Sequence, residues 1–138
     1  MDTIDKLEKV RNSIRNTMIS NIGIEITDVD EGFVCGRMPI DERTIQPLGL
    51  LHGGASVALA ESLGSIAGSM QVDPEKELVM GIEVNANHIK AIEKGWVYGK
   101  ALPVKIGKKN QVWEIKITNE RKKIICISRL ILAVVKIK

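Results

Sequence analysis

The run of residues 53–70 constrains the fold more than any other part of the chain, because it combines helical spacing with almost no charge. Leu59, Leu63 and Ile66 recur at three- and four-residue spacing and predict one apolar face of a helix. Glycines and alanines between them keep this helix slim enough for close packing. Glu61 is its only charged residue, and with Ser65 and two further serines it predicts a polar strip. We expect this strip to face something other than the domain's own sheet.

Four β-rich runs follow this helix: residues 78–89, 96–106, 112–119 and 124–137. Residues 22–28 and 33–39 precede it and predict a hairpin. This order predicts an α+β domain in which an antiparallel sheet wraps around one long central helix. Residues 3–19 have amphipathic helical spacing, so we expect residues 1–20 to form an N-terminal helix that packs on a domain of residues 21–138.

Length and charge exclude several classes of function. A chain of 138 residues suits one domain, and Lys and Arg outnumber Asp and Glu by only three (20 against 17), which is too small an excess to predict nucleic-acid binding. No apolar run suits a signal peptide or a membrane span, so the sequence predicts a cytoplasmic protein without a membrane partner. Cys35 and Cys126 lie in apolar surroundings and predict small buried side chains.

The start of the helix carries the clearest chemical signal, in His52, Gly53 and Gly54. Paired glycines at a helix start leave backbone N–H groups open to a ligand, and the helix dipole favours negative charge there. The lone carboxylate of Glu61 is costly in an apolar helix unless it is paired or used. An oxyanion site together with a nucleophile or base is the minimum equipment for acyl transfer.

The spacing of these groups predicts a dimer. Glu61 lies seven residues beyond Gly54, which is roughly 10 Å along a helix axis at about 1.5 Å per residue. An oxyanion donor and a base must both come within roughly 3 Å of one carbonyl group. We therefore expect two facing helices, with Glu61 of one subunit serving the glycine amides of the other.

Each of these residues also has a simpler interpretation. Glu61 suits an exposed helix surface, and Ser65 suits a small packing position as well as it suits a hydrogen bond to the carboxylate or substrate. His52 stands where a histidine often bonds local backbone, which favours positioning over proton transfer. Gln46 either binds a carbonyl group or a water molecule or is an ordinary loop residue.

Other catalytic motifs are missing from the sequence. There is no Gly-x-Ser-x-Gly elbow for a Ser-His-Asp triad. His52 and His88 are the only histidines and have no carboxylate or cysteine at ligand spacing, so no metal is predicted. The stretch from Lys105 to Lys109 lacks the upstream glycine and the final Ser or Thr of a P-loop.

The run Gln46-Pro-Leu-Gly-Leu-Leu-His-Gly-Gly-Ala-Ser-Val-Ala-Leu-Ala-Glu-Ser-Leu-Gly-Ser65 resembles the signature of hotdog-fold acyl-CoA thioesterases. The branch that it resembles contains the bacterial 1,4-dihydroxy-2-naphthoyl-CoA hydrolases and the 4-hydroxybenzoyl-CoA thioesterases that have a catalytic Glu on the central helix. Gly81-Ile-Glu-Val-Asn-Ala-Asn-His88, Gln111-Val-Trp-Glu-Ile and Ser128-Arg-Leu also match, so the resemblance covers nearly all of residues 22–135.

This resemblance implies an active site between two subunits that share one continuous sheet, and a pairing of such homodimers into a homotetramer. Glu61 would be the nucleophile or general base, and the Gly54 N–H would polarise the thioester carbonyl. Gln46 and His52 would help to place the carbonyl and the water. Ser65 would line the acyl pocket.

The resemblance also implies a channel for coenzyme A, which is part of the substrate, so no separate cofactor is expected. Clustered lysines at a turn suit its phosphates, although they equally suit an ordinary solvated hairpin. The matching positions are Gly81, His88, Ile89, Lys90, Ala91, Lys105, Ile106, Gly107, Lys108, Lys109 and Asn110.

The acyl group is the open part of this prediction. The resemblance favours an aromatic group such as 1,4-dihydroxy-2-naphthoyl, whereas an aromatic content of only 3% offers little for such a ring to stack on. Leu48 also stands where some relatives have an aromatic residue. The alternatives are a medium- or long-chain fatty acyl-CoA thioesterase, a non-catalytic acyl-CoA-binding domain of the same fold, and a hotdog dehydratase in which His88 would act.

Overall fold

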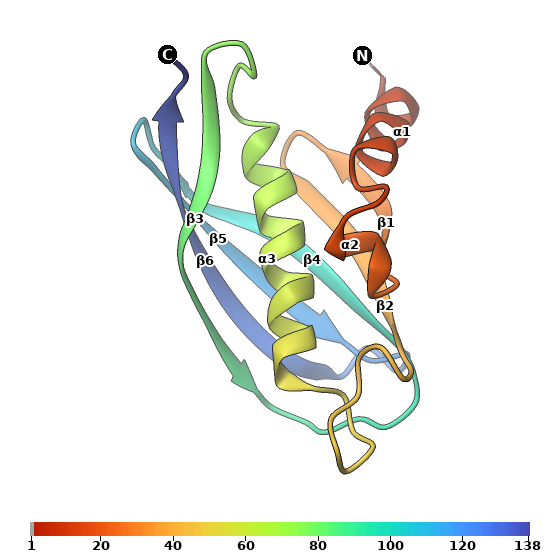
Figure 1. Cartoon of the computed structure of the whole chain (residues 1–138). Coiled ribbons are helices and arrows are strands. Elements are labelled where there is room, and N and C mark those ends of the chain that lie inside the picture. Colours follow the sequence, from red (N-terminus) through yellow and green to blue (C-terminus); the bar gives the residue numbers. More distant parts are fainter. Residues whose placement is uncertain (1) are drawn as a thin grey trace.

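The structure is a computed structural model that describes residues 2–138. Helices α1 (Thr3–Ser13) and α2 (Met18–Asn21) come first, and strands β1 (Glu25–Asp30) and β2 (Phe33–Ile40) form the predicted hairpin. The central helix α3 (Gly53–Ser69) leads to strands β3 (Glu77–His88), β4 (Gly95–Ile106), β5 (Asn110–Thr118) and β6 (Ile124–Lys136). Figure 1 shows α3 lying across the sheet.

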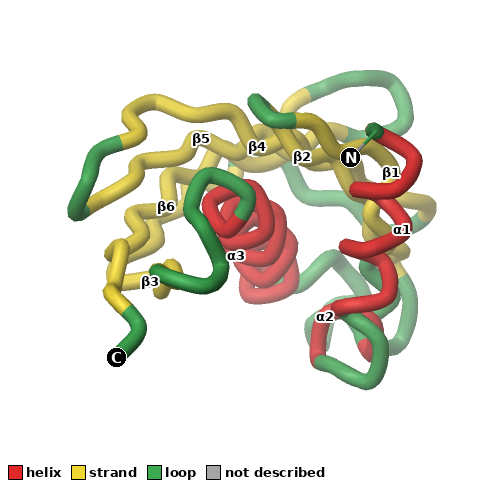
Figure 2. The backbone as a smooth tube through the Cα atoms, turned by 90° about the horizontal axis from the view of Figure 1, so that it is seen from above, coloured by secondary structure: helices red, strands yellow, loops and turns green. Residues whose placement is uncertain are grey.

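The six strands form one antiparallel sheet in the order β1-β2-β4-β5-β6-β3. The sheet curls around α3, with α1 and α2 on the side of β1 (Figure 2). The predicted α+β architecture, an antiparallel sheet wrapped around a long central helix, is confirmed. Between residues 2 and 138 no helix has the length and apolar character needed to cross a membrane.

The central helix packs into a gap on the inner face of the sheet. Gly36 and Gly99 face each other across β2 and β4, and a Cβ atom at either position would come within 2.7 Å of a methyl carbon of Leu63. Leu63 fills this gap and is fully buried. Burying one leucine side chain contributes about 1.5–3 kcal/mol, so the missing Cβ atoms allow the helix to approach the sheet closely.

The expected single helix over residues 3–19 is wrong, because the chain breaks between α1 and α2. Asn16 has φ = 60°, in the left-handed region that asparagine adopts more readily than most residues. The hydroxyl groups of Ser13 and Thr17 each donate to the carbonyl oxygen three residues earlier, at 2.7 and 2.6 Å. The apolar spacing continues through this break, and so the spacing alone does not reveal it.

Strand β3 changes the face that it turns to α3. Its pairing with β6 shifts between Gly81 and Glu83, so Ile82 is an extra residue at a β-bulge. Before the bulge Gly81 faces α3, and after it Val84 and His88 do. An extra residue reverses the alternation of side chains along a strand, and this bulge therefore decides which residues of β3 reach the helix.

Candidate active site

The first turn of α3 is held in place by the loops beside it. Thr44 is buried, and its hydroxyl group donates to the carbonyl oxygen of Pro39 (2.8 Å). The carbonyl oxygen of Thr44 accepts the N–H of His52 (2.8 Å). The N–H of Leu51 donates to the carbonyl oxygen of Ile92 (2.8 Å), which ties the helix start to the loop after β3.

His52 caps α3 with its side chain. Its Nδ1 accepts the N–H of Gly54 at 2.7 Å, which is a usual bond between an N-cap side chain and the second helical residue. A ring nitrogen that accepts a hydrogen bond carries no proton, so neutral His52 carries its proton on Nε2. The cap therefore uses Nδ1 and leaves Nε2–H free to donate.

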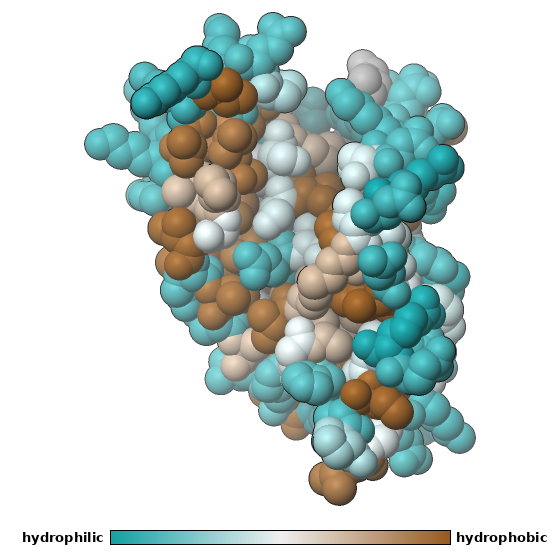
Figure 3. Space-filling view, viewed as in Figure 1, coloured by the Kyte–Doolittle hydropathy of each residue, from teal (hydrophilic) through white to brown (hydrophobic). Residues whose placement is uncertain are grey.

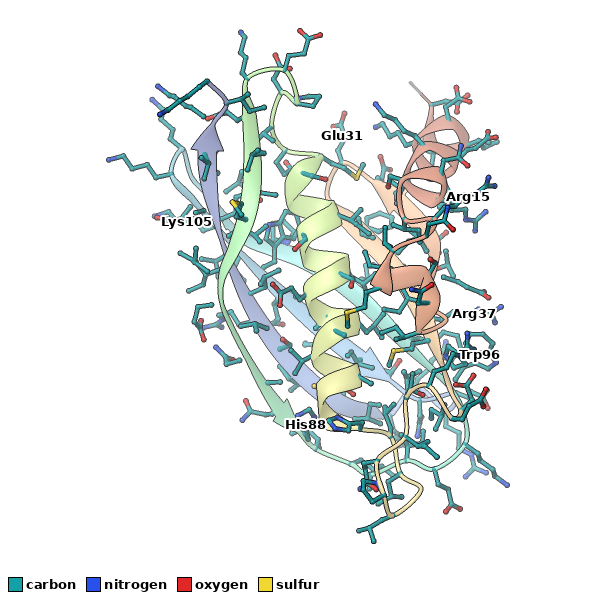
Figure 4. The ribbon with its side chains drawn as sticks, in the orientation of Figure 1. Arg15, Glu31, Arg37, His88, Trp96 and Lys105 are labelled. Carbon is teal, nitrogen blue, oxygen red and sulfur yellow. The ribbon has the colours of Figure 1, made fainter. Side chains whose placement is uncertain are left out.

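The N–H group of Gly53, rather than that of Gly54, is open to a ligand. Within residues 2–138, no acceptor is hydrogen-bonded to the Gly53 N–H. The ring of His88 lies against Gly53: a Cβ atom built on this glycine would be 3.0 Å from Nε2 of His88. Figure 4 shows His88 at the start of the helix. The Gly54 N–H, which the sequence predicts as the oxyanion donor, is therefore already bonded to His52, and the neighbouring Gly53 N–H is the open one.

A cavity of about 320 Å³ opens beside Gly53. Gln46 lines it, and because its Oε1 accepts the N–H of Leu48 (2.5 Å), its NH₂ group is left to donate. Residues 88–91 line the same cavity, together with Ser56 and aliphatic side chains. The structure thus brings together Gln46 and four of the residues predicted to bind coenzyme A.

Glu61 lies apart from these donors. It follows Gly53 by eight residues, roughly 12 Å along the axis at about 1.5 Å per residue, and it is not part of the cavity wall. Its carboxylate lies against Gly81 of the edge strand β3, so the expectation that the polar strip avoids the chain's own sheet is wrong for Glu61. No hydrogen bond or ion pair joins this carboxylate to another residue among 2–138. Ser65 is half-buried one turn further along α3.

The predicted lysine turn lies at the other end of α3. Residues 106–109 line a second cavity of about 530 Å³, and Figure 4 shows Lys105 far from His88. Lys136, which the sequence did not single out, joins Lys108 and Lys109 in this cavity. One chain therefore does not bring the two groups expected to hold coenzyme A, residues 88–91 and residues 105–110, into one site.

Neither cysteine is placed as a nucleophile. Burial raises the pKa of the Cys126 thiol and of the Cys35 thiol, and this disfavours the reactive thiolate. Cys126 stands opposite His88 in the pairing of β3 with β6, but no hydrogen bond joins their side chains. In the described part of the chain, no three His, Cys, Asp or Glu residues are grouped as a metal site requires.

The chain is similar to proteins of one family. A profile of the Thioesterase superfamily matches residues 48–126. The 1,4-dihydroxy-2-naphthoyl-CoA hydrolase of Listeria monocytogenes is 47% identical over 115 residues, which are 83% of this chain and 93% of that protein.

Solved structures agree with this assignment. A crystal structure of a thioesterase from Haemophilus influenzae has a TM-score of 0.90 at 43% identity and covers 94% of this chain and 90% of that one. A glutamine-to-alanine variant of a Pseudomonas aeruginosa thioesterase has a TM-score of 0.92 at 41% identity and covers 95% and 94%. The resemblance seen in the sequence, the hotdog fold and the enzyme class are confirmed. The chain belongs to the Thioesterase superfamily and is a thioester hydrolase.

Proposed function

We propose that the protein hydrolyses an acyl-CoA to a carboxylic acid and coenzyme A, in a site shared by two subunits. The observation that carries this proposal is the pair of donors at the start of α3, the N–H of Gly53 and the NH₂ group of Gln46, beside one cavity. A thioester carbonyl oxygen that accepts both hydrogen bonds gains its negative charge at the positive end of the helix dipole. Donors fixed in advance where charge develops are a large source of rate acceleration.

The carboxylate comes from the second subunit. Glu61 of the same chain is roughly 12 Å from Gly53 along the axis, too far to reach the same carbonyl carbon. The partner subunit's Glu61 either attacks that carbon, forming an anhydride that water then opens, or removes a proton from the attacking water. In both routes the C–S bond breaks and the coenzyme A sulfur leaves as a thiolate that takes up a proton.

The exposed edge of the sheet supports such a dimer. Strand β3 is an edge strand, and its side chains Leu78, Met80 and Ile82 are 41%, 58% and 60% exposed. Figure 3 shows apolar side chains gathered along this edge. A long apolar edge is open to pairing with another strand, and a two-fold axis across the middle of β3 would continue the sheet and reverse the second α3.

This two-fold arrangement would also bring together the two groups of residues that are predicted to bind coenzyme A and lie at opposite ends of α3. The lysine turn lies at the C-terminal end of α3 and residues 88–91 lie at its N-terminal end. Reversal of the second α3 would carry the partner subunit's lysine turn to the end where residues 88–91 of the first chain lie. The homotetramer and the cytoplasmic location stay predictions.

For the acyl group we propose an aromatic acid such as 1,4-dihydroxy-2-naphthoate, because the Listeria relative, 47% identical, is a hydrolase of that thioester. A fatty acyl group is the second candidate, since the cavity beside Gly53 has aliphatic walls that include Leu50, Leu51 and Ile125. Thiol release from a panel of aryl-CoA and alkyl-CoA substrates measures kcat/KM for each of the two classes of acyl group. A preference for alkyl chains would overturn the aromatic assignment.

Complementation tests the shared site. Glu61→Ala removes the carboxylate, and Gly53→Pro removes the donor N–H. In a mixture that exchanges subunits, a heterodimer has one site with both lesions and one with neither, so we expect half of its sites to regain activity. If every mixture stays as inactive as the two parents while heterodimers are detected, the site is not shared.

A further inference from the structure

Gly81 lies where the edge strand β3 passes beside the middle of α3. A Cβ atom built on Gly81 would be 2.5 Å from Oε2 of Glu61, so the carboxylate occupies the space that any other residue would fill. Leu130, on the neighbouring strand β6, also borders this space, at 3.8 Å from the same point. The side chain of Glu61 is half-buried there.

The backbone at this position does not itself require glycine. The glycines with positive φ are Gly23, Gly49 and Gly95, and Gly81 is not among them. Gly81 faces the helix before the β-bulge, and the bulge that follows reverses the alternation and so turns His88 toward Gly53. Bulges beside active sites commonly set the direction of a side chain in this way. The lack of a Cβ atom at Gly81 therefore leaves room for the carboxylate of Glu61.

We infer that Gly81 is a positioning residue, which sets the direction of the Glu61 carboxylate by leaving the space between α3 and β3 in which this carboxylate lies. This inference rests on the proposed function, in which Glu61 acts on the thioester carbonyl of the opposite subunit. No hydrogen bond or ion pair within residues 2–138 holds the carboxylate. Packing against Gly81 is therefore what fixes its direction before substrate binds.

The competing role for Gly81 is direct contact with coenzyme A, as the family resemblance implies. The two roles predict different kinetics. A methyl group that displaces the Glu61 carboxylate lowers kcat and leaves KM for the acyl-CoA nearly unchanged. A methyl group that obstructs coenzyme A raises KM, and it does so whether or not Glu61 is present.

The test is Gly81→Ala, with Gly32→Ala as the matched control, because a Cβ atom at Gly32 meets nothing within 4 Å. We expect Gly81→Ala to lower kcat by about 10²-fold, since a displacement of about 1 Å at a reacting group costs this much. The melting temperature should not fall, because the added methyl group meets only the end of a flexible side chain and the backbone conformation suits alanine. Light scattering checks that the oligomeric state is unchanged.

Two double variants complete the test. In a Glu61→Ala background, Gly81→Ala should have no further effect on the residual kcat. In the Gly81→Ala background, Glu61→Asp should lose less activity than it does alone, because the shorter side chain fits beside the methyl group. A change confined to KM, or full additivity with Glu61→Ala, would overturn the inference. Wild-type activity in Glu61→Ala alone would instead overturn the proposed function.

Discussion

The two ends of α3 are fixed in opposite ways. At the C-terminal end, Gln111 is 1% exposed, donates to the carbonyl oxygen of Gly68 (3.2 Å) and accepts the indole N–H of Trp113 (2.9 Å). These polar groups are satisfied inside the protein. At the N-terminal end, His52 satisfies the N–H of Gly54, while the N–H of Gly53 has no acceptor among residues 2–138 and adjoins a cavity.

This difference suggests that the C-terminal end of α3 anchors the helix and that the N-terminal end binds the substrate. A buried network whose members are all bonded makes one end of the helix rigid against β5. An amide without an acceptor is a cost to the folded protein unless solvent or a ligand supplies one. We therefore expect substitutions at the N-terminal end to change activity and substitutions at the C-terminal end to change stability.

The largest expected effect is that of Gly53→Pro on activity. Proline suits the first position of a helix, and His52, with φ = −67° and ψ = 132°, has the extended backbone that a following proline requires. Only the N–H is lost, so kcat should fall by about 10²–10³-fold, as for other single oxyanion donors. Thiol release measures this loss.

Gly53→Ala is the control for this variant, because it crowds His88 in a similar way but keeps the N–H. It should keep most of the activity that proline removes. An equal loss in both variants would show that the contact with His88, and not the amide, matters at this position.

The next effect is at the opposite end, where Gln111→Leu should lower the free energy of unfolding and leave kcat nearly unchanged. It leaves the indole N–H of Trp113 unpaired, at about 1–3 kcal/mol for a buried group, while the carbonyl oxygen of Gly68 keeps the N–H of Gln71 (3.0 Å). Urea unfolding measures the loss. Adding Trp113→Phe removes this unpaired group, so the loss in the double variant should be smaller than the sum of the losses in the two single variants, and a fully additive loss would contradict the network.

The main elements could be predicted because they depend on composition and period. The spacing of Leu59 and Leu63 and the lack of charge around them leave a buried helix as the only good solution for residues 53–70. The break at Asn16 escaped prediction, since the apolar positions on either side keep helical spacing across it. Here the local hydrogen bonds of two hydroxyl groups outweigh the pattern.

Within the candidate site, the residue types were predictable but not which amide is open. Taking His52 as the N-cap would have pointed to Gly53, because an N-cap side chain binds the N–H of the second or third helical residue and leaves the first unclaimed. Which residues of β3 face Glu61 and Gly53 depends on the bulge after Gly81, and no alternation in the sequence reveals this bulge. A glycine inside a strand was the one available signal.

A smaller effect is expected for His52, whose side chain both caps α3 and presents a donor. His52→Ala should lower the free energy of unfolding by about 1 kcal/mol through loss of the cap, and His52→Asn should restore most of it. Both variants should lose kcat, because neither presents Nε2–H at the same place. If activity in His52→Asn returned along with stability, the histidine would be a cap only.

The smallest effect concerns the loop that leads to the N-terminal end. The Arg43 guanidinium donates to Asp41 at 2.6 and 3.1 Å and so lowers the pKa of that carboxyl below its ordinary 3.8. The pair therefore stabilises the fold at neutral pH, and this contribution is lost as the pH falls below 3.8 and through the lowered pKa. Both side chains are partly exposed, at 43% and 27%, and such pairs contribute little.

Asp41→Asn isolates this charge, because asparagine keeps an oxygen that can accept the N–H of Arg43 (2.9 Å). Urea unfolding should show the variant slightly less stable than the wild type at neutral pH and equal to it in acid. The kcat should be unchanged, because Thr44, which holds His52, bonds to Asp41 only through the backbone of Asp41, and asparagine keeps that backbone. A stability difference that persisted in acid would assign the effect to the loop's geometry instead of its charge. A fall in kcat at neutral pH would mean that the Asp41 side chain helps to hold the start of α3, in addition to the bond between Thr44 and His52.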